Sequence, residues 1–199
     1  GHSPVNYWMH SNMLNFEGKK MSKSEGNSIL PLQLLTGNHP PLDKGYSPMT
    51  VRFLFLQSHY SGQTDISIKS VHDAEKGLRK TMNALDYISK MDWNQKTIQA
   101  EIEKDIQLNL TQVVDNLCDD FNTAKAIANL FALSSHINTL HHQTEVGISE
   151  EVFNQLKKIY SDIVINVFGL TEEASTSNQA LDATMNLIIE LRKNARADK

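Results

Sequence analysis

A segment rich in lysine and serine lies near the beginning of the chain. Residues 19–27 read Lys-Lys-Met-Ser-Lys-Ser-Glu-Gly-Asn, so three lysines, two serines and a glycine fall within eight positions. Lysine ammonium groups bind phosphate oxygens as point charges, serine hydroxyls and backbone N–H groups add donors, and Gly26 permits close backbone approach. This combination suits the stabilisation of charge that develops on a polyphosphate while a nucleophile attacks it. The spacing differs from the GxxxxGK[ST] phosphate loop, and a solvated basic loop has the same composition.

The composition of the chain is that of a globular protein. Of 199 residues, 40% are hydrophobic and 21% are charged, which excludes disordered, collagen-like and disulfide-scaffold classes. Cys118 is the single cysteine, so neither an internal disulfide nor a CxxC zinc site can form. The net charge of −4 means that any nucleic-acid binding requires a local basic patch. Runs of about 18 apolar residues are absent, so no membrane span is expected.

Charge and proline content divide the chain near residue 60. Residues 1–60 hold five Lys/Arg and three acids, giving +2, whereas the remainder carries −6. All five prolines fall within the first 48 residues. We therefore predict two parts: an irregular, loop-rich segment at 1–60, and a helical segment at 61–199 that lacks helix-breaking prolines.

The second part predicts a bundle of amphipathic helices. Apolar residues at helical spacing run over residues 68–88, 106–117, 127–140, 152–167 and 181–191, and the expected core includes Val114 and Val167. Ser67, Asn122 and Ser149 are suitable N-caps, and Gly169 is a natural helix stop. The predicted fold is mainly α: an irregular segment with short helices, followed by an antiparallel bundle of about five helices.

The first part has weaker signals. Leu14–Phe16 predicts a short strand followed by a turn at Glu17-Gly18, and residues 28–35 predict a short helix closed by Thr36-Gly37. Ser47-Pro48 opens a further helix that extends to Leu56. Residues 5–10 could be a strand or a helix end.

A family resemblance becomes visible at the lysine–serine segment. Residues 20–24 spell Lys-Met-Ser-Lys-Ser, which resembles the KMSKS signature of class I aminoacyl-tRNA synthetases, and Glu25-Gly26-Asn27 continues as that family does. Flanking stretches at 7–14, 51–60, 118–126 and 187–196 are similar to cysteinyl-tRNA synthetases. The resemblance extends over essentially the whole chain.

The resemblance implies an enzyme of protein biosynthesis, a cysteine–tRNA ligase. ATP, with Mg²⁺, activates cysteine to cysteinyl-adenylate, and the cysteinyl group then passes to the 3′ end of tRNA(Cys). By the same resemblance Lys20 and Lys23 are the catalytic lysines and contact ATP, together with Met21, Ser22 and Ser24. The helical part resembles the DALR-like bundle that holds the tRNA, mainly through phosphate and sugar. A cytoplasmic enzyme, monomeric when intact, is expected.

Two family features have no counterpart in the sequence. The HIGH signature, which binds adenosine and phosphates, is missing together with the nucleotide-binding core. The family's Zn²⁺ ligands are two cysteines, a histidine and a glutamate upstream of this segment, so no metal ligand is assigned in this chain. We therefore expect an internal or C-terminal portion of a larger protein that cannot form cysteinyl-tRNA by itself.

Several other residues admit a functional or a structural interpretation. Trp8 and His10 could face the substrate pocket, and Arg192, Lys193 and Arg196 could contact tRNA phosphates or form a solvated face. His59-Tyr60 could pack on the catalytic core or approach the tRNA, and no ligand set accompanies His141-His142. Exposed apolar surface is expected from Tyr7, Trp8, Phe16 and residues 51–56.

Two alternative functions remain open. The first is a related ligase that joins activated cysteine to an amino sugar in mycothiol synthesis, and it would use the same loop. The second is a non-catalytic helical interaction module, which has no need of Lys20 and Lys23.

Overall fold

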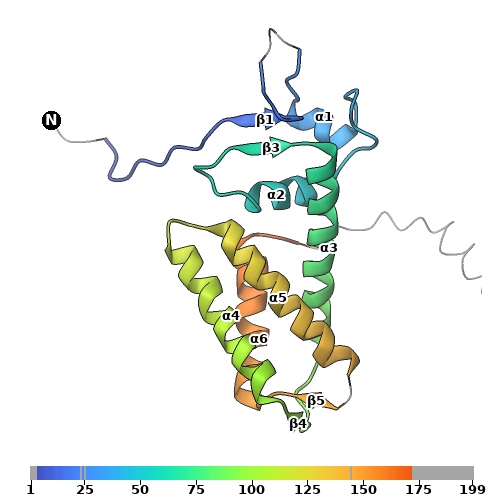
Figure 1. The fold of residues 1–199 in the computed structure, drawn as a ribbon, viewed down its shortest axis with the longest axis vertical. Helices are drawn as coiled ribbons and strands as arrows, with labels where there is room; N and C mark the ends of the chain where they lie inside the picture. The colour runs from blue at the N-terminus through green and yellow to red at the C-terminus, as the bar shows by residue number, and fades with distance from the viewer. Residues whose placement is uncertain (1–3, 23, 25, 144, 172–199) are drawn as a thin grey trace, which may run out of the picture.

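The computed structural model describes residues 4–22, 24, 26–143 and 145–171. Within them the fold is mainly α, as predicted. A small sheet and two short helices form one end of the molecule, and a bundle of helices forms the rest (Figure 1). Among the described residues, no helix combines the length and apolar character needed to cross a membrane.

The sheet at the first end has three strands in the order β2-β1-β3. Strand β1 (Leu14–Phe16) is the predicted one, and it pairs antiparallel with β2 (Lys19–Lys20). Strand β3 (Thr64–Ile66), which the sequence analysis did not identify, pairs parallel with β1. A strand from beyond residue 60 therefore completes the sheet that carries the lysine–serine segment.

A tight turn connects β1 to β2. Glu17 and Gly18 have φ values of 49° and 75°, so both lie in the left-handed region that two-residue hairpin turns require. The Gly18 N–H donates to Asp65 Oδ1 at 2.8 Å, which ties the turn to β3. The turn is thus held against β3, the strand that also pairs with β1.

Two short helices follow the hairpin. Helix α1 (Pro31–Thr36) begins at a proline and ends at Gly37, whose φ of 73° gives the left-handed C-cap that a glycine adopts without strain. Helix α2 (Pro48–Leu56) begins as predicted: the Ser47 hydroxyl accepts the Thr50 N–H at 3.0 Å. Both prolines occupy the first helical turn, where a backbone N–H has no partner within the helix, so its absence in proline costs no hydrogen bond.

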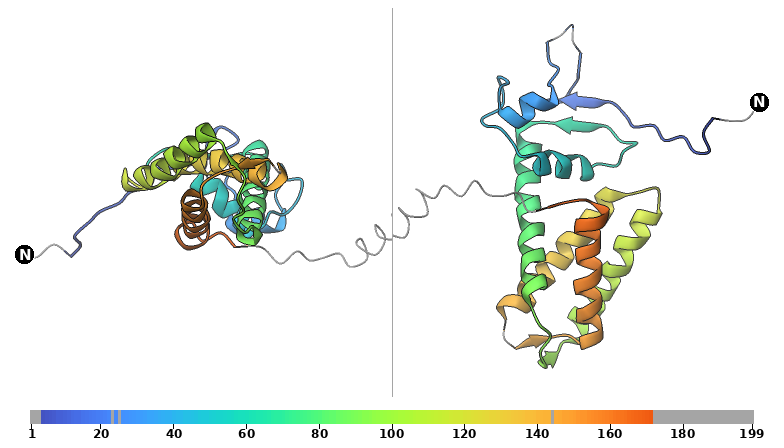
Figure 2. Two further views of the ribbon diagram at one scale, coloured as in Figure 1. Left: turned by 90° about the horizontal axis from the view of Figure 1, so that it is seen from below. Right: turned by 180° about the vertical axis from the view of Figure 1, so that it is seen from behind.

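Four antiparallel helices form the described part of the bundle: α3 (Ile68–Lys90), α4 (Ala100–Cys118), α5 (Thr123–His142) and α6 (Glu150–Ser161). Strands β4 (Thr97–Ile98) and β5 (Val146–Gly147) pair at the far end, and α6 lies behind α5 (Figures 1 and 2). With 23 residues, α3 spans about 35 Å and runs from the sheet to that far end. The predicted helix at 181–191 lies outside the described residues.

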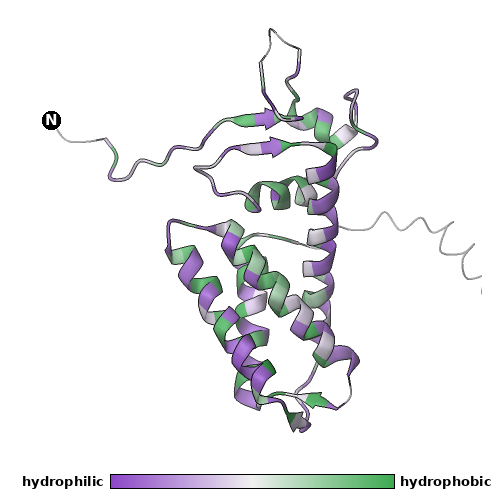
Figure 3. Cartoon of the chain, viewed as in Figure 1, coloured by the Kyte–Doolittle hydropathy of each residue, from purple (hydrophilic) through white to green (hydrophobic). Residues whose placement is uncertain are grey.

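The bundle core is built from the apolar stripes of these helices. Hydrophobic and hydrophilic segments alternate along each helix (Figure 3), and the fully buried side chains include Ile88, Ile106, Leu133, Leu156 and Tyr160. The predicted N-caps are confirmed: Ser67, Asn122 and Ser149 each accept a backbone N–H of the following turn. The amphipathic pattern therefore located four of the helices correctly.

Two predicted core residues are solvent-exposed. Val114 is 43% exposed because Val113, one position earlier on α4, takes the buried side, and successive helical residues point about 100° apart. Val167 is 53% exposed at the end of η1, a π-helical segment (Asp162–Val167) that continues α6. The wider π turn shifts the helical phase, so the α-helical spacing from α6 no longer applies there.

A glycine in the middle of α3 allows α2 and α5 to approach it closely. A Cβ atom at Gly77 would lie 2.8 Å from Phe53 Cε1 and 2.9 Å from Phe131 Cζ. The two rings lie 6.1 Å apart and fill the space that the absent side chain leaves. Glycine costs about 1 kcal/mol of helix stability relative to alanine, and this packing accounts for its presence.

Candidate functional site

The chain continues from β2 into a loop that projects away from the helices (Figure 1). Strands β1 and β2 together with this loop are called the hairpin below. Lys19 and Lys20 lie in strand β2 and are exposed. Lys20 was expected in a loop, but its backbone pairs with Asn15 of β1, because strand pairing continues past the Glu17-Gly18 turn. Lys23 lies outside the described residues. Lys20 is therefore carried on a strand and not on a freely moving loop.

The side-chain amide of Asn27 closes this loop through two hydrogen bonds, one from its oxygen and one from its nitrogen. Its Oδ1 accepts the Ser22 N–H at 2.8 Å, and its Nδ2 donates to the Lys20 carbonyl at 3.0 Å. Within the loop the hydroxyls of Ser22 and Ser24 lie 2.7 Å apart, and the half-buried Met21 packs on the core. Asn27 thus fixes the backbone at Lys20 and at Ser22. The sequence analysis assigned it no role, although it lies three residues after Ser24.

We expect Asn27→Ala to accelerate hydrogen exchange at the Ser22 amide by about threefold to tenfold. The substitution removes the acceptor of that N–H, and a hydrogen bond of this kind contributes roughly 0.5–1.5 kcal/mol. NMR hydrogen exchange on the 199-residue chain measures the effect, with Asn154→Ala on an exposed position of α6 as the matched control. An unchanged Ser22 rate would contradict the closing role of Asn27.

The residues before β1 are extended and exposed. Residues 5–10 form neither of the predicted elements, and the Trp8 and His10 rings stack with centroids 6.0 Å apart. Tyr7 and Trp8 are exposed as expected, at 90% and 71%. The expected exposure was wrong for Phe16, Phe53 and Leu54, which are buried because the sheet and α2 pack on the bundle.

A cluster of polar contacts joins the end of α2 to the corner between α4 and α5. Tyr60 Oη donates to Asp120 Oδ1 at 2.6 Å, and His59 Nε2 lies 3.0 Å from the Asp120 carbonyl oxygen. The hydrogen bond to the Asp120 carboxylate raises the pKa of Tyr60. On the other side, the Tyr60 carbonyl accepts the Asn12 N–H at 3.0 Å, just before β1. Hydrogen bonds therefore connect the bundle corner to the hairpin.

The corner itself has an unusual backbone. Asp120 and Phe121 have φ values of 54° and 52°, which non-glycine residues rarely adopt. The break between the helices expected over 106–117 and 127–140 lies here, and the Asn122 side chain caps α5 as predicted. Asp120 is held in this conformation by its contacts with His59 and Tyr60. Phe121 is left 61% exposed.

Beside this corner lies an apolar cavity of about 580 Å³. Its lining includes Met9, Leu14, Phe55, Leu56, Tyr60 and Phe121. The cavity thus combines the segment before β1, the end of α2 and the corner.

The described residues contain no group of three or more His, Cys, Asp or Glu side chains that could hold a metal ion. His141 and His142 end α5, where His141 stacks on Tyr87 with ring centroids 4.1 Å apart. Cys118 is exposed at the end of α4. Arg192, Lys193 and Arg196 lie outside the described residues.

Two family models match the chain. Residues 1–76 match the catalytic domain of class I (C) tRNA synthetases, and residues 112–172 match the DALR domain. The first range covers the hairpin, α1, α2 and the start of α3. The second covers the end of α4, α5 and α6.

Curated relatives share nearly the whole chain. A cysteine–tRNA ligase of Cytophaga hutchinsonii is 35% identical over 98% of this chain and 40% of its own length. Ligases of the same name from Parabacteroides distasonis and Deinococcus radiodurans are 33% and 32% identical over 100% of this chain and 40% of their own length. The chain therefore spans about 40% of the length of the relatives it matches.

Proposed function

Because this chain belongs to the cysteine–tRNA ligase family of class I aminoacyl-tRNA synthetases, we propose that it takes part in attaching cysteine to tRNA(Cys). In the first step the cysteine carboxylate attacks the α-phosphate of ATP, which forms cysteinyl-adenylate and releases pyrophosphate. In the second step a hydroxyl of the 3′-terminal ribose attacks the activated carbonyl and releases AMP. The chain contributes the residues of the hairpin to the first step and the bundle to the second.

The hairpin geometry carries this proposal. Asn27 ties the backbone of Ser22 to that of Lys20, and the exposed Lys20 projects from the strand beside them. Lys20 and Lys23 supply positive charge to the phosphates of Mg²⁺-bound ATP as the bond to pyrophosphate breaks. The Ser22 and Ser24 hydroxyls donate to phosphate oxygens, and Met21 anchors the loop on the core. Such positioned charge lowers the barrier where negative charge develops.

The remaining assignments extend the same proposal. We retain the division at residue 60, with 1–60 closing the catalytic domain and 61–199 forming the tRNA-binding bundle. Trp8 and His10 face the substrate pocket, and Arg192, Lys193 and Arg196 contact the tRNA. The Zn²⁺ that binds the substrate thiol has its ligands outside this chain, so the residues of this chain act on ATP and on the tRNA and not on the metal. The whole enzyme is a cytoplasmic monomer.

The mycothiol ligase and the non-catalytic helical module are not favoured. The relatives that share the whole chain with it carry the name cysteine–tRNA ligase, and the module has no use for a closed loop bearing Lys20. The cysteine–tRNA ligase function therefore has the strongest support.

A hybrid ligase tests this proposal. In it, residues 1–199 replace the matching 40% of the Cytophaga hutchinsonii ligase. We expect cysteine-dependent exchange between ATP and pyrophosphate, and none from the same ligase with the segment deleted. A hybrid that unfolds at the temperature of its parent but catalyses no exchange would contradict the proposal.

A further inference from the structure

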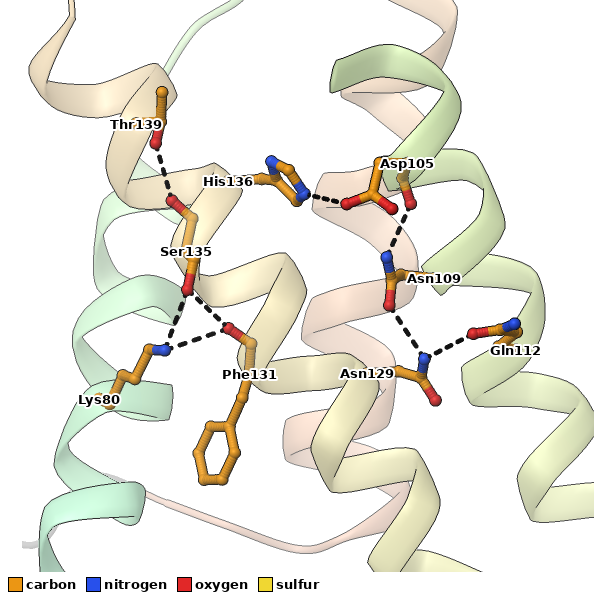
Figure 4. Close-up of polar contacts among 9 residues, drawn as sticks. All are labelled: Lys80, Asp105, Asn109, Gln112, Asn129, Phe131, Ser135, His136 and Thr139. Carbon is orange, nitrogen blue, oxygen red and sulfur yellow. Dashed lines mark hydrogen bonds and ion pairs between the residues drawn. The ribbon is translucent and has the colours of Figure 1, made fainter. Parts of the chain in front are cut away.

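A seam of polar side chains joins α4 to α5 along their contact (Figure 4). The amide nitrogen of Asn129 on α5 donates to Asn109 Oδ1 at 2.9 Å and to Gln112 Oε1 at 2.8 Å. Further along the same two helices, His136 Nε2 lies 2.6 Å from Asp105 Oδ2. A polar network of this kind favours one packing, because any slip of one helix along the other leaves its groups unpaired. The seam therefore fixes the position of the corner between the two helices.

Asp120 of this corner holds the segment that follows α2. Its carboxylate accepts the Tyr60 hydroxyl at 2.6 Å, and its carbonyl oxygen lies 3.0 Å from His59 Nε2. A carbonyl oxygen can only accept, so His59 Nε2 is the donor. His59 Nδ1 then accepts from Ser61, whose hydroxyl oxygen lies 2.7 Å away. Side-chain and backbone atoms of Asp120 thus fix residues 59–61 to the bundle.

The same three residues hold the chain just before β1. Asn12 donates its backbone N–H to the Tyr60 carbonyl and its side-chain Nδ2 to the Ser61 carbonyl, both at 3.0 Å. The orientation of this amide is set in turn, because Asn12 Oδ1 accepts the Met13 N–H at 2.8 Å. Strand β1 begins two residues after Asn12. The start of the hairpin is therefore tied to the segment that Asp120 holds.

Side-chain packing beside these contacts is incomplete. The apolar cavity of about 580 Å³ lies against them, and Asn12, Tyr60 and Phe121 are among the residues that line it. Because side chains do not fill this space, the hydrogen bonds carry much of the connection between the corner and the start of β1. The other end of β1 differs, since Phe16 is buried in the core. The start of β1 therefore depends on Asp120 more than its end does.

We propose that Asp120 is a positioning residue for the ATP-dependent step: through Tyr60 and Asn12 it holds the start of the hairpin in a fixed place on the bundle. This inference rests on the proposed function. Lys20 pairs with Asn15 of β1, so a displacement of β1 also displaces the lysine. Charge stabilises the transition state only from the right place, and a small displacement therefore lowers the rate.

The position of Asp120 in the chain gives the bundle a part in amino-acid activation. Residues 1–76 match the catalytic domain, whereas Asp120 lies within the DALR match at 112–172. A displaced hairpin weakens charge stabilisation at the phosphates, while the Zn²⁺ ligands that bind the cysteine thiol lie outside this chain. Loss of the Asp120 contact should therefore lower kcat and leave the KM for cysteine unchanged.

Hydrogen exchange of the 199-residue chain tests the contacts themselves. Asp120→Asn keeps the size of the side chain, and asparagine tolerates the positive φ of this position. The substitution removes the charge that strengthens the bond from Tyr60. We expect the Asn12 amide to exchange about threefold to tenfold faster in Asp120→Asn and in Tyr60→Phe. Asp119→Asn removes the same charge from the neighbouring exposed residue and should leave the rate unchanged.

The hybrid ligase tests the consequence for catalysis. We expect Asp120→Asn and Tyr60→Phe each to lower the kcat of pyrophosphate exchange about threefold to tenfold, with thermal unfolding unchanged and with Asp119→Asn equal to the unaltered hybrid. The double variant should be no slower than the slower single variant, because both substitutions act on one contact. In a Lys23→Ala background, Asp120→Asn should have little further effect, because the charge that it positions is already reduced.

Three results would overturn this assignment in an active hybrid. The first is a kcat for Asp120→Asn equal to that of Asp119→Asn, and the second is faster exchange of the Asn12 amide without any change in kcat. The third is a double variant whose losses multiply, which would mean that Asp120 does not act through Tyr60. An unaltered hybrid without pyrophosphate exchange would overturn the proposed function and this inference with it, a result distinct from an active hybrid that is indifferent to Asp120.

Discussion

Lys23→Ala is expected to lower cysteine-dependent ATP–pyrophosphate exchange of the hybrid ligase by two or more orders of magnitude. The lysine stabilises charge on the phosphates only as the bond to pyrophosphate breaks, so its loss raises the activation barrier more than it weakens ATP binding. At about 1.36 kcal/mol per decade, the loss corresponds to roughly 2.7 kcal/mol or more. Exchange measured at saturating ATP isolates this effect from binding.

Lys19→Ala is the matched control for Lys23→Ala. Lys19 is an exposed lysine of the same segment but precedes the five signature residues. We expect it to change exchange by less than about threefold, and thermal unfolding should be the same for both variants. If Lys23→Ala left exchange unchanged, the signature would have no role in activation, and the helical interaction module would become the better explanation.

Tyr160→Ala is expected to reduce the free energy of unfolding by about 4 kcal/mol, in the range for truncating a large buried aromatic residue. Tyr160 is 0% exposed and lies where α3, α5 and α6 meet. Its hydroxyl lies 2.7 Å from Ser134 Oγ and donates to the Thr81 carbonyl at 3.1 Å. Urea denaturation followed by far-ultraviolet circular dichroism measures the change.

Tyr160→Phe separates the packing of this residue from its hydrogen bonds. It keeps the ring but removes the hydroxyl, and we expect it to cost only about 1–2 kcal/mol, because Ser134 retains a bond to the Leu130 carbonyl. Burial raises the pKa of Tyr160, so the phenol remains neutral and the comparison holds across neutral pH. Equal losses for the two variants would mean that the ring contributes little to the bundle.

Local signals in the sequence predicted the helices well. Ser47, Ser67, Asn122 and Ser149 each begin a helix where their side chains can accept a backbone N–H, and Gly37 and Gly169 have positive φ at helix ends. These features depend on residues within one helical turn, so no knowledge of the tertiary structure is needed. The lysine–serine segment could be recognised from the sequence because its residues are also neighbours along the chain.

Features that depend on distant contacts were not predictable. Strand β3 has three residues and owes its conformation to pairing with β1, about 50 positions earlier. The Tyr60–Asp120 contact spans 60 positions, and η1 shifts the phase of a helix whose sequence shows no break. The closing role of Asn27 depends on the geometry of the hairpin.

Transfer of labelled cysteine to tRNA(Cys) by the hybrid ligase is the most direct test of the account, because it requires both the hairpin and the bundle. The account predicts charging by the hybrid, abolished by Lys23→Ala. A folded hybrid that forms cysteinyl-adenylate but leaves tRNA(Cys) uncharged would contradict the role of the bundle. A folded hybrid that forms no adenylate would contradict the role of the hairpin.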